Sequence, residues 1–223
     1  MPTIRPDLDM YASNSVAEWS RVRGLSGSSF DSNNVKDAFA TSVQLATKGG
    51  ATFIIRRSMF VYDTSSITSD VASASIDVTG YSQSSADIIL VKAVFVGGIG
   101  AGYFDDFKGT SAATALSNSD GSGAGTLASA GIDYSSEVAT WNTSGVNQIS
   151  LNATALADIK GEDDLMIIMM EYDHDYLDIE YPSAGYKAVG LWWDESGGTN
   201  SPKLNYTLAT ASTDNAIFFG ANF

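Results

Sequence analysis

Residues 52–76 read TFIIRRSMFVYDTSSITSDVASASI, and they carry the strongest strand pattern in the sequence. Its first part, Thr52 to Tyr62, is rich in β-branched and aromatic residues, and polar turn residues flank it on both sides. A continuous apolar run bounded by turn residues is typical of a central strand that is covered on both faces. We predict that this strand and a second one beginning at Ala74 start an antiparallel β-sandwich.

Further apolar runs of strand length follow along the chain, separated by segments rich in glycine, serine and threonine. We predict strands over residues 86–96, 146–151, 165–172, 189–193 and 203–208, short strands over 19–22 and 138–141, and one helical turn over 153–159 that Asn152 caps. Residues 109–131 are small and polar and predict a long loop within the domain. Short strands separated by turn residues indicate a sandwich or jelly roll.

The first 50 residues are the least regular part of the sequence. Residues 35–47 fit two patterns, because Val35, Phe39 and Val43 share one face of a helix, whereas Phe39, Thr41 and Val43 alternate as in a strand. We favour the strand because the rest of the chain has an all-β pattern. We therefore expect a single domain of 223 residues, with residues 1–50 as an N-terminal extension that contributes the first strands, 51–209 as the sandwich and 210–223 as a tail.

The charge balance is strongly acidic, with 12 basic and 26 acidic residues and a net charge of −14. Such a surface disfavours nucleic acids and anionic membranes, which proteins bind through clustered Lys and Arg. The sequence contains no run of about 18 apolar residues, so it predicts no membrane-spanning helix. Its first residues lack an apolar segment, so we expect no secretory signal there. The charge favours solubility and also suits a cation or a basic partner.

Three strings resemble those of the DNRLRE-like jelly-roll domains. RRSMFVYDTSSI (56–67) resembles the opening of that family, VNQISLNATALADI (146–159) a middle passage and NSPKLNYTLA (200–209) its closing strand. Their order and spacing also agree, so the resemblance spans residues 50–209. It implies a jelly-roll fold. The family includes carbohydrate-binding modules of secreted enzymes, and similar sequences occur in phage virion proteins.

The version of these strings found here looks more like the phage-type members. The resemblance therefore implies a structural virion protein, such as a capsid decoration or cement protein, made in the host cytoplasm and located on the capsid surface. Its expected partners are the major capsid protein and copies of itself. The alternative is a carbohydrate-binding or host-recognition module of a fibre or tail, with a glycan as ligand.

The segment EYDHDYLDIE (171–180) is the densest group of acids and the first candidate site. Asp173, Asp175 and Asp178 follow a predicted strand, and carboxylates at a strand exit can supply the oxygen ligands that calcium requires. The spacing does not match an EF-hand, and a solvated acidic loop is the alternative. We expect no other cofactor. His174 is the only histidine, and we interpret it as a surface or turn residue.

Catalytic motifs are missing from the sequence. It has no cysteine, no G-x-S-x-G string and no zinc-ligand spacing, so we expect no enzyme. Arg56 and Arg57 lie inside an apolar strand, and we expect a buried one to pair with a carboxylate. Trp192 and Trp193 must face opposite ways in one strand, so one of them packs in the core and the other can contact a sugar or another subunit.

The last eight residues, AIFFGANF, are unusually apolar. Ile217, Phe218, Phe219 and Phe223 follow a polar spacer, and burying a large apolar side chain is worth about 1.5–3 kcal/mol. Such a tail packs either on its own sandwich or on a neighbouring subunit. We assign these four residues as partner-binding candidates.

Overall fold

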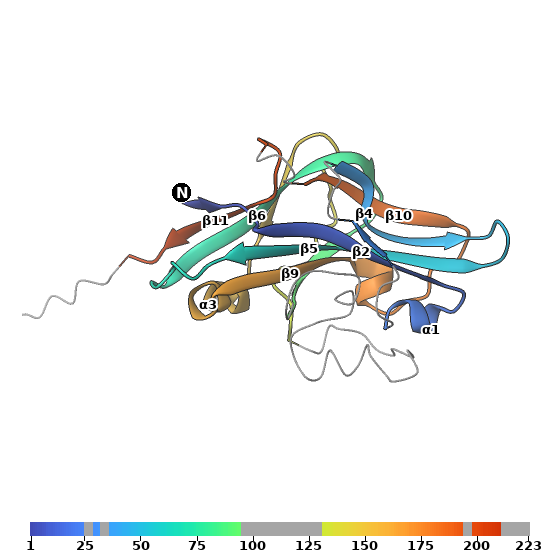
Figure 1. Ribbon diagram of the computed structural model, residues 1–223, viewed down its shortest axis with the longest axis horizontal. Helices are drawn as coiled ribbons and strands as arrows, with labels where there is room; N and C mark the ends of the chain where they lie inside the picture. The colour runs from blue at the N-terminus through green and yellow to red at the C-terminus, as the bar shows by residue number, and fades with distance from the viewer. Residues whose placement is uncertain (25–28, 32–35, 95–130, 194–197, 211–223) are drawn as a thin grey trace, which may run out of the picture.

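The computed structural model describes residues 1–24, 29–31, 36–94, 131–193 and 198–210, and the side chains of residues 82–84 are not described (Figure 1). The described elements, in chain order, are β1 (Thr3–Ile4), β2 (Leu8–Val16), α1 (Trp19–Val22), β3 (Ser29–Asp31), β4 (Lys36–Ala46), β5 (Thr52–Asp63), β6 (Val71–Ser84), β7 (Ile88–Lys92), β8 (Val146–Ser150), α3 (Ala153–Gly161), β9 (Asp164–Glu171), the π-helical turn η3 (Tyr172–Tyr176), β10 (Gly185–Trp192) and β11 (Lys203–Leu208). The predicted all-β, antiparallel sandwich is confirmed.

β5 is the central strand of the larger sheet. It pairs with β2 along one edge, and on its other edge it pairs with β4 through its first residues and with β9 through its last residues. Figure 1 shows β2, β5 and β9 as neighbouring ribbons across the middle of the molecule. β3, β10 and β7 extend this sheet from β2, β4 and β9. The strand predicted over residues 52–62 therefore pairs with three other strands of this sheet.

β6 connects the two sheets. Its first half lies between β11 and β8 in the smaller sheet, which β1 completes next to β11. Near its end β6 pairs with β10 of the larger sheet, where Gly80 lies opposite Leu191. One strand of 14 residues thus takes part in both layers and fixes how they pack.

The main core lies between the sheets. Alternate residues of β5 point into it, among them Phe60 and Tyr62, and they meet Ile76 and Val78 of β6. α3 closes one end with Ala155 and Ile159, and Asn152 caps this helix as predicted, because its Oδ1 accepts the Ala155 N–H at 3.1 Å. Burying these alternating faces is the main source of stability of the sandwich.

A second core covers the outer face of the larger sheet. Phe53, Ile55 and Met59 of β5 point into it, opposite the residues that enter the main core. α1 covers it with Trp19 and Val22, and η3 contributes the buried ring of Tyr176. β5 is therefore covered on both faces, as its continuous apolar run predicts, and the larger sheet needs a third layer that the sandwich alone does not supply.

The structure corrects several expected elements. Residues 19–22 form α1 rather than a strand, because they cover the outer face of the sheet instead of joining its edge. Val138 makes an isolated bridge to Ile88 instead of starting a strand. Residues 1–50 are more regular than predicted: β2 is a nine-residue strand beside β5, and residues 36–46 form β4, the strand that we favoured over a helix. Nearly all of the loop expected over 109–131 lies outside the described residues.

Candidate functional site

The aspartates predicted to bind calcium each contact a cationic side chain. Asp173 accepts a hydrogen bond from Lys187, and Oδ1 of Asp178 lies 2.8 Å from Nη1 of Arg23. Asp175, the third, is fully buried in an ion pair. In the part of the chain that the structure describes, no group of three or more His, Cys, Asp or Glu side chains could hold a metal ion. The predicted calcium ligands therefore do not converge on a site there.

Asp175 instead belongs to a cluster of Arg23, Arg57, Asp175 and Asp178, which we name the arginine–carboxylate cluster. The two oxygens of Asp175 accept from Nε and Nη2 of Arg57 at 2.7 and 2.6 Å. Nε of Arg23 donates to the backbone carbonyl of Asp175 at 2.8 Å. The expectation that a buried strand arginine pairs with a carboxylate is confirmed for Arg57. The cluster links β5, the residue after α1 and the turn η3.

Burial shapes the electrostatics of this cluster. Burial lowers the pKa of Arg23, while the charges of Asp175 and Asp178 act in the opposite direction. Removing one member of such a pair leaves an uncompensated buried charge, which is why buried pairs are costly to break. The cluster therefore joins α1 and η3 to the sheet, because loss of one charged side chain leaves its partner buried without a counter-charge. A buried ion pair by itself is only weak evidence for high stability.

Glu171 begins the same turn and is also fully buried. Its Oε2 accepts the backbone N–H groups of His174 and Asp175 at 2.7 and 3.2 Å, while its Oε1 makes no hydrogen bond among the described residues. Burial raises the pKa of Glu171 to about 7, and the nearby charges of Asp175 and Asp173 add to this rise. The hydrogen bonds from the two N–H groups act in the opposite direction and lower the pKa. The carboxyl group that caps this turn thus changes its charge near neutral pH.

His174 is a buried turn residue. Its Nδ1–H donates to the carbonyl of Ile179 at 2.8 Å, and its ring meets Tyr181 edge-on at 4.8 Å. These contacts fix the ring within the turn. The turn interpretation of His174 therefore agrees with the structure, whereas the surface alternative is wrong because the side chain is buried.

A pocket of about 380 Å³ lies on the other side of η3 and is lined by Ile89, Asp133, Ser135, Ser136, Glu137, Asn152, Tyr172 and Tyr176. We name it the tyrosine pocket. Tyr172 and Tyr176 stack with their centroids 5.3 Å apart and their planes 19° apart, because the π-helical turn brings its first and last residues over one another. The turn that the arginine–carboxylate cluster holds on one side thus presents two aromatic rings on the other.

The opposite wall of the tyrosine pocket is a segment that runs along the edge of β7. The N–H of Tyr134 donates to the carbonyl of Leu90, and Val138 exchanges hydrogen bonds with Ile88. Between these contacts the side chain of Ser135, not its backbone, accepts the Leu90 N–H at 3.0 Å. The backbone therefore departs from β7 at this point, and residues 135–137 project outward to form the wall.

The pocket is fixed by hydrogen bonds between its own walls. The Tyr176 hydroxyl donates to Oδ1 of Asp133 at 2.6 Å, and burial together with this bond raises the pKa of Tyr176 well above its ordinary value. Nδ2 of Asn152 donates to the carbonyl of Asp133 at 2.5 Å. Other polar groups keep their bonding capacity: the Tyr172 hydroxyl, Oδ2 of Asp133 and the carboxylate of Glu137 make no hydrogen bond or ion pair among the described residues.

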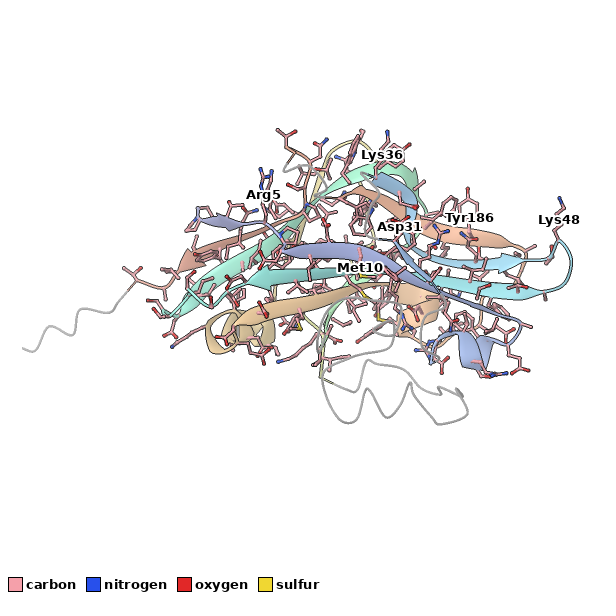
Figure 2. All side chains as sticks on the ribbon, in the orientation of Figure 1. Arg5, Met10, Asp31, Lys36, Lys48 and Tyr186 are labelled. Atoms are coloured by element: carbon pink, nitrogen blue, oxygen red, sulfur yellow. The ribbon has the colours of Figure 1, made fainter. Side chains whose placement is uncertain are left out.

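Trp192 and Trp193 face opposite ways, as predicted for neighbouring residues of one strand. Trp193 is buried in the main core, whereas Trp192 is half-buried and meets Tyr81 edge-on at 5.9 Å. Nζ of Lys36 lies over both rings, 4.4 Å from the centroid of Tyr81 and 4.8 Å from that of Trp192. Figure 2 shows Lys36 and Tyr186 on the same side of the molecule. Trp19 and Trp141 are buried and offer no surface for a ligand.

Sequence reasoning missed the tyrosine pocket and Arg23, one of the four residues of the arginine–carboxylate cluster. Tyr172 and Tyr176 are four residues apart in EYDHDY, but a strand followed by a loop was expected there, so no stacking was inferred. Arg23 lies about 150 residues from its partner Asp175, and no local pattern connects them. The four tail residues Ile217, Phe218, Phe219 and Phe223 lie outside the described residues.

Comparison with known proteins adds no family. A scan of protein-family models finds no match to this chain, and a search of curated proteins finds no matching relative. The resemblance to the DNRLRE-like domains therefore stays a prediction. No helix in the described ranges is long and apolar enough to cross a membrane.

Proposed function

We propose that the chain is a non-catalytic structural protein of a bacteriophage particle, a decoration or cement protein on the capsid surface. In this proposal it is made in the host cytoplasm and binds the major capsid protein and copies of itself. The observation that carries the proposal is the position of its exposed apolar side chains. Phe30, Val146 and Leu208 are 52%, 58% and 47% exposed, and each lies on a strand at or next to a sheet margin.

The strands β3 and β8 lie at margins of the described sheets. Among the described residues, β3 pairs only with β2, and β8 pairs only with β6. Unpaired strand edges present backbone N–H and C=O groups that can pair with another chain. An exposed apolar side chain on each edge, Phe30 on β3 and Val146 on β8, adds surface that gains free energy when a partner covers it.

A rigid body suits a protein that binds a shell by its margins. Two cores and the buried arginine–carboxylate cluster fix the arrangement of strands, so little order has to be gained on binding. The net charge of −14 keeps copies that are not bound apart in solution. The rigid sandwich and the acidic charge both support a subunit that joins a particle and does not aggregate freely.

The most strongly perturbed carboxyl group in the described ranges serves the fold. Glu171 caps η3 from a fully buried position, so a substrate does not reach it without a rearrangement of the turn. His174 bonds a backbone carbonyl in the same turn. These roles favour the non-catalytic interpretation, because perturbed acids and histidines are the usual sources of acid–base catalysis.

A glycan-recognition module of a fibre or tail is the second candidate. The half-buried pair of Trp192 and Tyr81 offers aromatic surface of the kind on which sugars stack. However, Lys36 already covers both rings, so a sugar would have to displace its ammonium group. The sheet margins favour the capsid role over this one.

Sedimentation with phage heads tests the proposal. The purified full chain is mixed with heads of the phage that encodes it, and bound chain is measured in the pelleted particles. We expect the double variant Phe30→Asp and Val146→Asp to lose binding, because a charge on an apolar contact must be desolvated. Ile179→Asp is the matched control, since Ile179 is 53% exposed but lies outside the strands.

The result has two contradicting outcomes. A wild-type chain that stays in the supernatant at every head concentration would exclude a decoration role. Equal binding by the edge variant and the wild type would retain the role but would show that the strand margins are not the contact surface.

A further inference from the structure

We propose that the tyrosine pocket binds an organic cation, namely an alkylammonium or guanidinium group. This inference is independent of the proposed capsid role, because none of the pocket residues is among the exposed apolar residues that carry that role. It rests on the shape of the pocket, on the stacked tyrosine rings and on the two carboxylates that line it.

The pocket has the size and rigidity of a ligand site. Its volume of about 380 Å³ lies within the range of small-molecule sites. Asn152 and Tyr176 both donate hydrogen bonds to Asp133 within the wall, and Ser135 accepts the N–H of Leu90 in β7. The cavity is therefore built by its own contacts, so binding a small group requires little rearrangement.

The charge of the lining selects the sign of the ligand. Asp133 and Glu137 place two carboxylates in the wall, and no Lys or Arg lines the pocket among the described residues. Oδ1 of Asp133 accepts from the Tyr176 hydroxyl, which leaves Oδ2 as an acceptor. Two carboxylates of one sign in a concave site concentrate a positive ligand, and the net charge of −14 adds to this field.

The tyrosine rings distinguish an organic cation from a metal ion. A calcium ion needs six to eight oxygen ligands, and the described residues contain no group of acids that could hold a metal. An ammonium or guanidinium group instead gains from an aromatic face within about 6 Å. Tyr172 is half-buried, so part of its ring is open to a ligand, and its hydroxyl makes no hydrogen bond among the described residues.

A neutral sugar fits the lining less well. Its hydroxyl groups can donate to Asp133 and Glu137, but it brings no positive charge to two carboxylates that lose water on binding. Aromatic stacking would be available to either ligand. The two carboxylates of the lining therefore favour a cation over a sugar, and the test below includes a sugar as a competing ligand.

Titration of the isotope-labelled full chain with Nα-acetyl-lysine N-methylamide tests this inference by NMR. We expect saturable shifts of the amide signals of Ser136, Tyr172 and Tyr176, with an affinity that falls as salt is added. Glu137→Gln should weaken binding about fivefold, the size of one partly screened charge contact. Glu180→Gln is the matched control, because Glu180 is an exposed acid outside the pocket lining and should leave the affinity unchanged.

Two further probes identify the source of the cation. Tighter binding of the lysine derivative than of putrescine would indicate the basic side chain of a partner protein, and the reverse would indicate a free amine; both results support the pocket as a cation site. The inference is overturned if the lysine derivative leaves the pocket signals unchanged. It is also overturned if Glu137→Gln binds as the control does, or if methyl glucoside binds at these residues more tightly than either amine.

Discussion

Asp175 bonds Arg57 through both carboxylate oxygens, at 2.7 and 2.6 Å, and both side chains are completely removed from solvent. Arg57 belongs to the central strand β5, and Asp175 belongs to the turn η3, 118 residues further along the chain. The same turn stacks Tyr172 on Tyr176. One buried ion pair therefore fixes the position of the wall of the tyrosine pocket relative to the sheet.

Replacing Asp175 with Asn should destabilise the chain by about 3–5 kcal/mol, because it leaves the guanidinium of Arg57 buried without a counter-charge. Urea unfolding followed by circular dichroism measures the loss. Asp173→Asn is the matched control in the same turn, since the Asp173–Lys187 pair is about one-third exposed and such pairs contribute at most about 1 kcal/mol. Equal losses in the two variants would show that burial of the Arg57 pair has no special weight.

Glu171 should make stability depend on pH between about 4.5, its ordinary pKa, and about 7, its raised pKa in the fold. In that window the folded chain keeps a proton on Glu171 that the unfolded chain has released. The folded state therefore binds more protons, and stability falls as the pH rises through the window and levels off above it. The contribution is about 3 kcal/mol, since one pKa unit corresponds to about 1.4 kcal/mol.

The difference between the wild type and Glu171→Gln isolates this effect from all other titrating groups. Gln offers an oxygen to the N–H groups of His174 and Asp175 but does not titrate, so its stability relative to the wild type should rise between pH 5 and 8. Unfolding free energies measured across this range give the comparison. Parallel curves for the two proteins would mean that the pKa of Glu171 is not raised.

Gly190 should tolerate no side chain. It lies in β10, where the register with β4 and β6 shifts, and a Cβ there would come 2.1 Å from the carbonyl oxygen of Tyr81 and 2.8 Å from that of Asp37. Both neighbours are backbone atoms, so the strands must move apart. We expect Gly190→Ala to destabilise the chain by about 3 kcal/mol in urea unfolding.

The matched control for this substitution is Gly161→Ala. Gly161 is the last residue of α3, and a Cβ there meets no atom within 4 Å. Alanine should stabilise the chain by about 0.5 kcal/mol, because it restricts the unfolded chain more than glycine does. A similar small effect at both positions would contradict the close packing of β10 between its neighbours.

Deleting residues 216–223 should abolish assembly and leave the fold intact. This prediction rests on sequence alone, since Ile217, Phe218, Phe219 and Phe223 lie outside the described residues. Circular dichroism checks the fold, and sedimentation with heads checks assembly. If the truncated chain assembles as the full chain does, the tail does not bind a neighbour. If it unfolds, the tail packs on its own sandwich.

The sequence predicted the sheet strands well where the apolar runs were long. The β5 run and the strands over 146–150, 164–171 and 203–208 agree with prediction within a few residues, because burial on one or both faces leaves a local pattern. β2 was missed because its sequence, LDMYASNSV, mixes small polar residues with few large apolar ones. Its place beside β5 comes from long-range pairing.

The candidate sites were harder to predict because they depend on contacts between distant segments. Asp175 and Asp178 were identified, but their arginine partners come from two other parts of the chain, and only those partners show that the two acids serve the fold. The tyrosine pocket similarly combines η3 with residues 133–137 and Asn152. A π-helical turn leaves no sequence period that separates it from a loop, so the stacking of its tyrosines could not be anticipated.

The proposed capsid role implies that the chain is encoded by a phage, so electron cryomicroscopy of particles of that phage is its decisive test. We predict density for the β-sandwich at symmetric positions on the outer surface of the head, with the margins at β3 or β8 in contact with the shell or with a neighbouring copy. Heads purified without the chain should lack this density and should release their DNA at a lower temperature. Purified heads that contain no copy of the chain, or a chain that occurs only in infected cells and never in particles, would contradict the structural role.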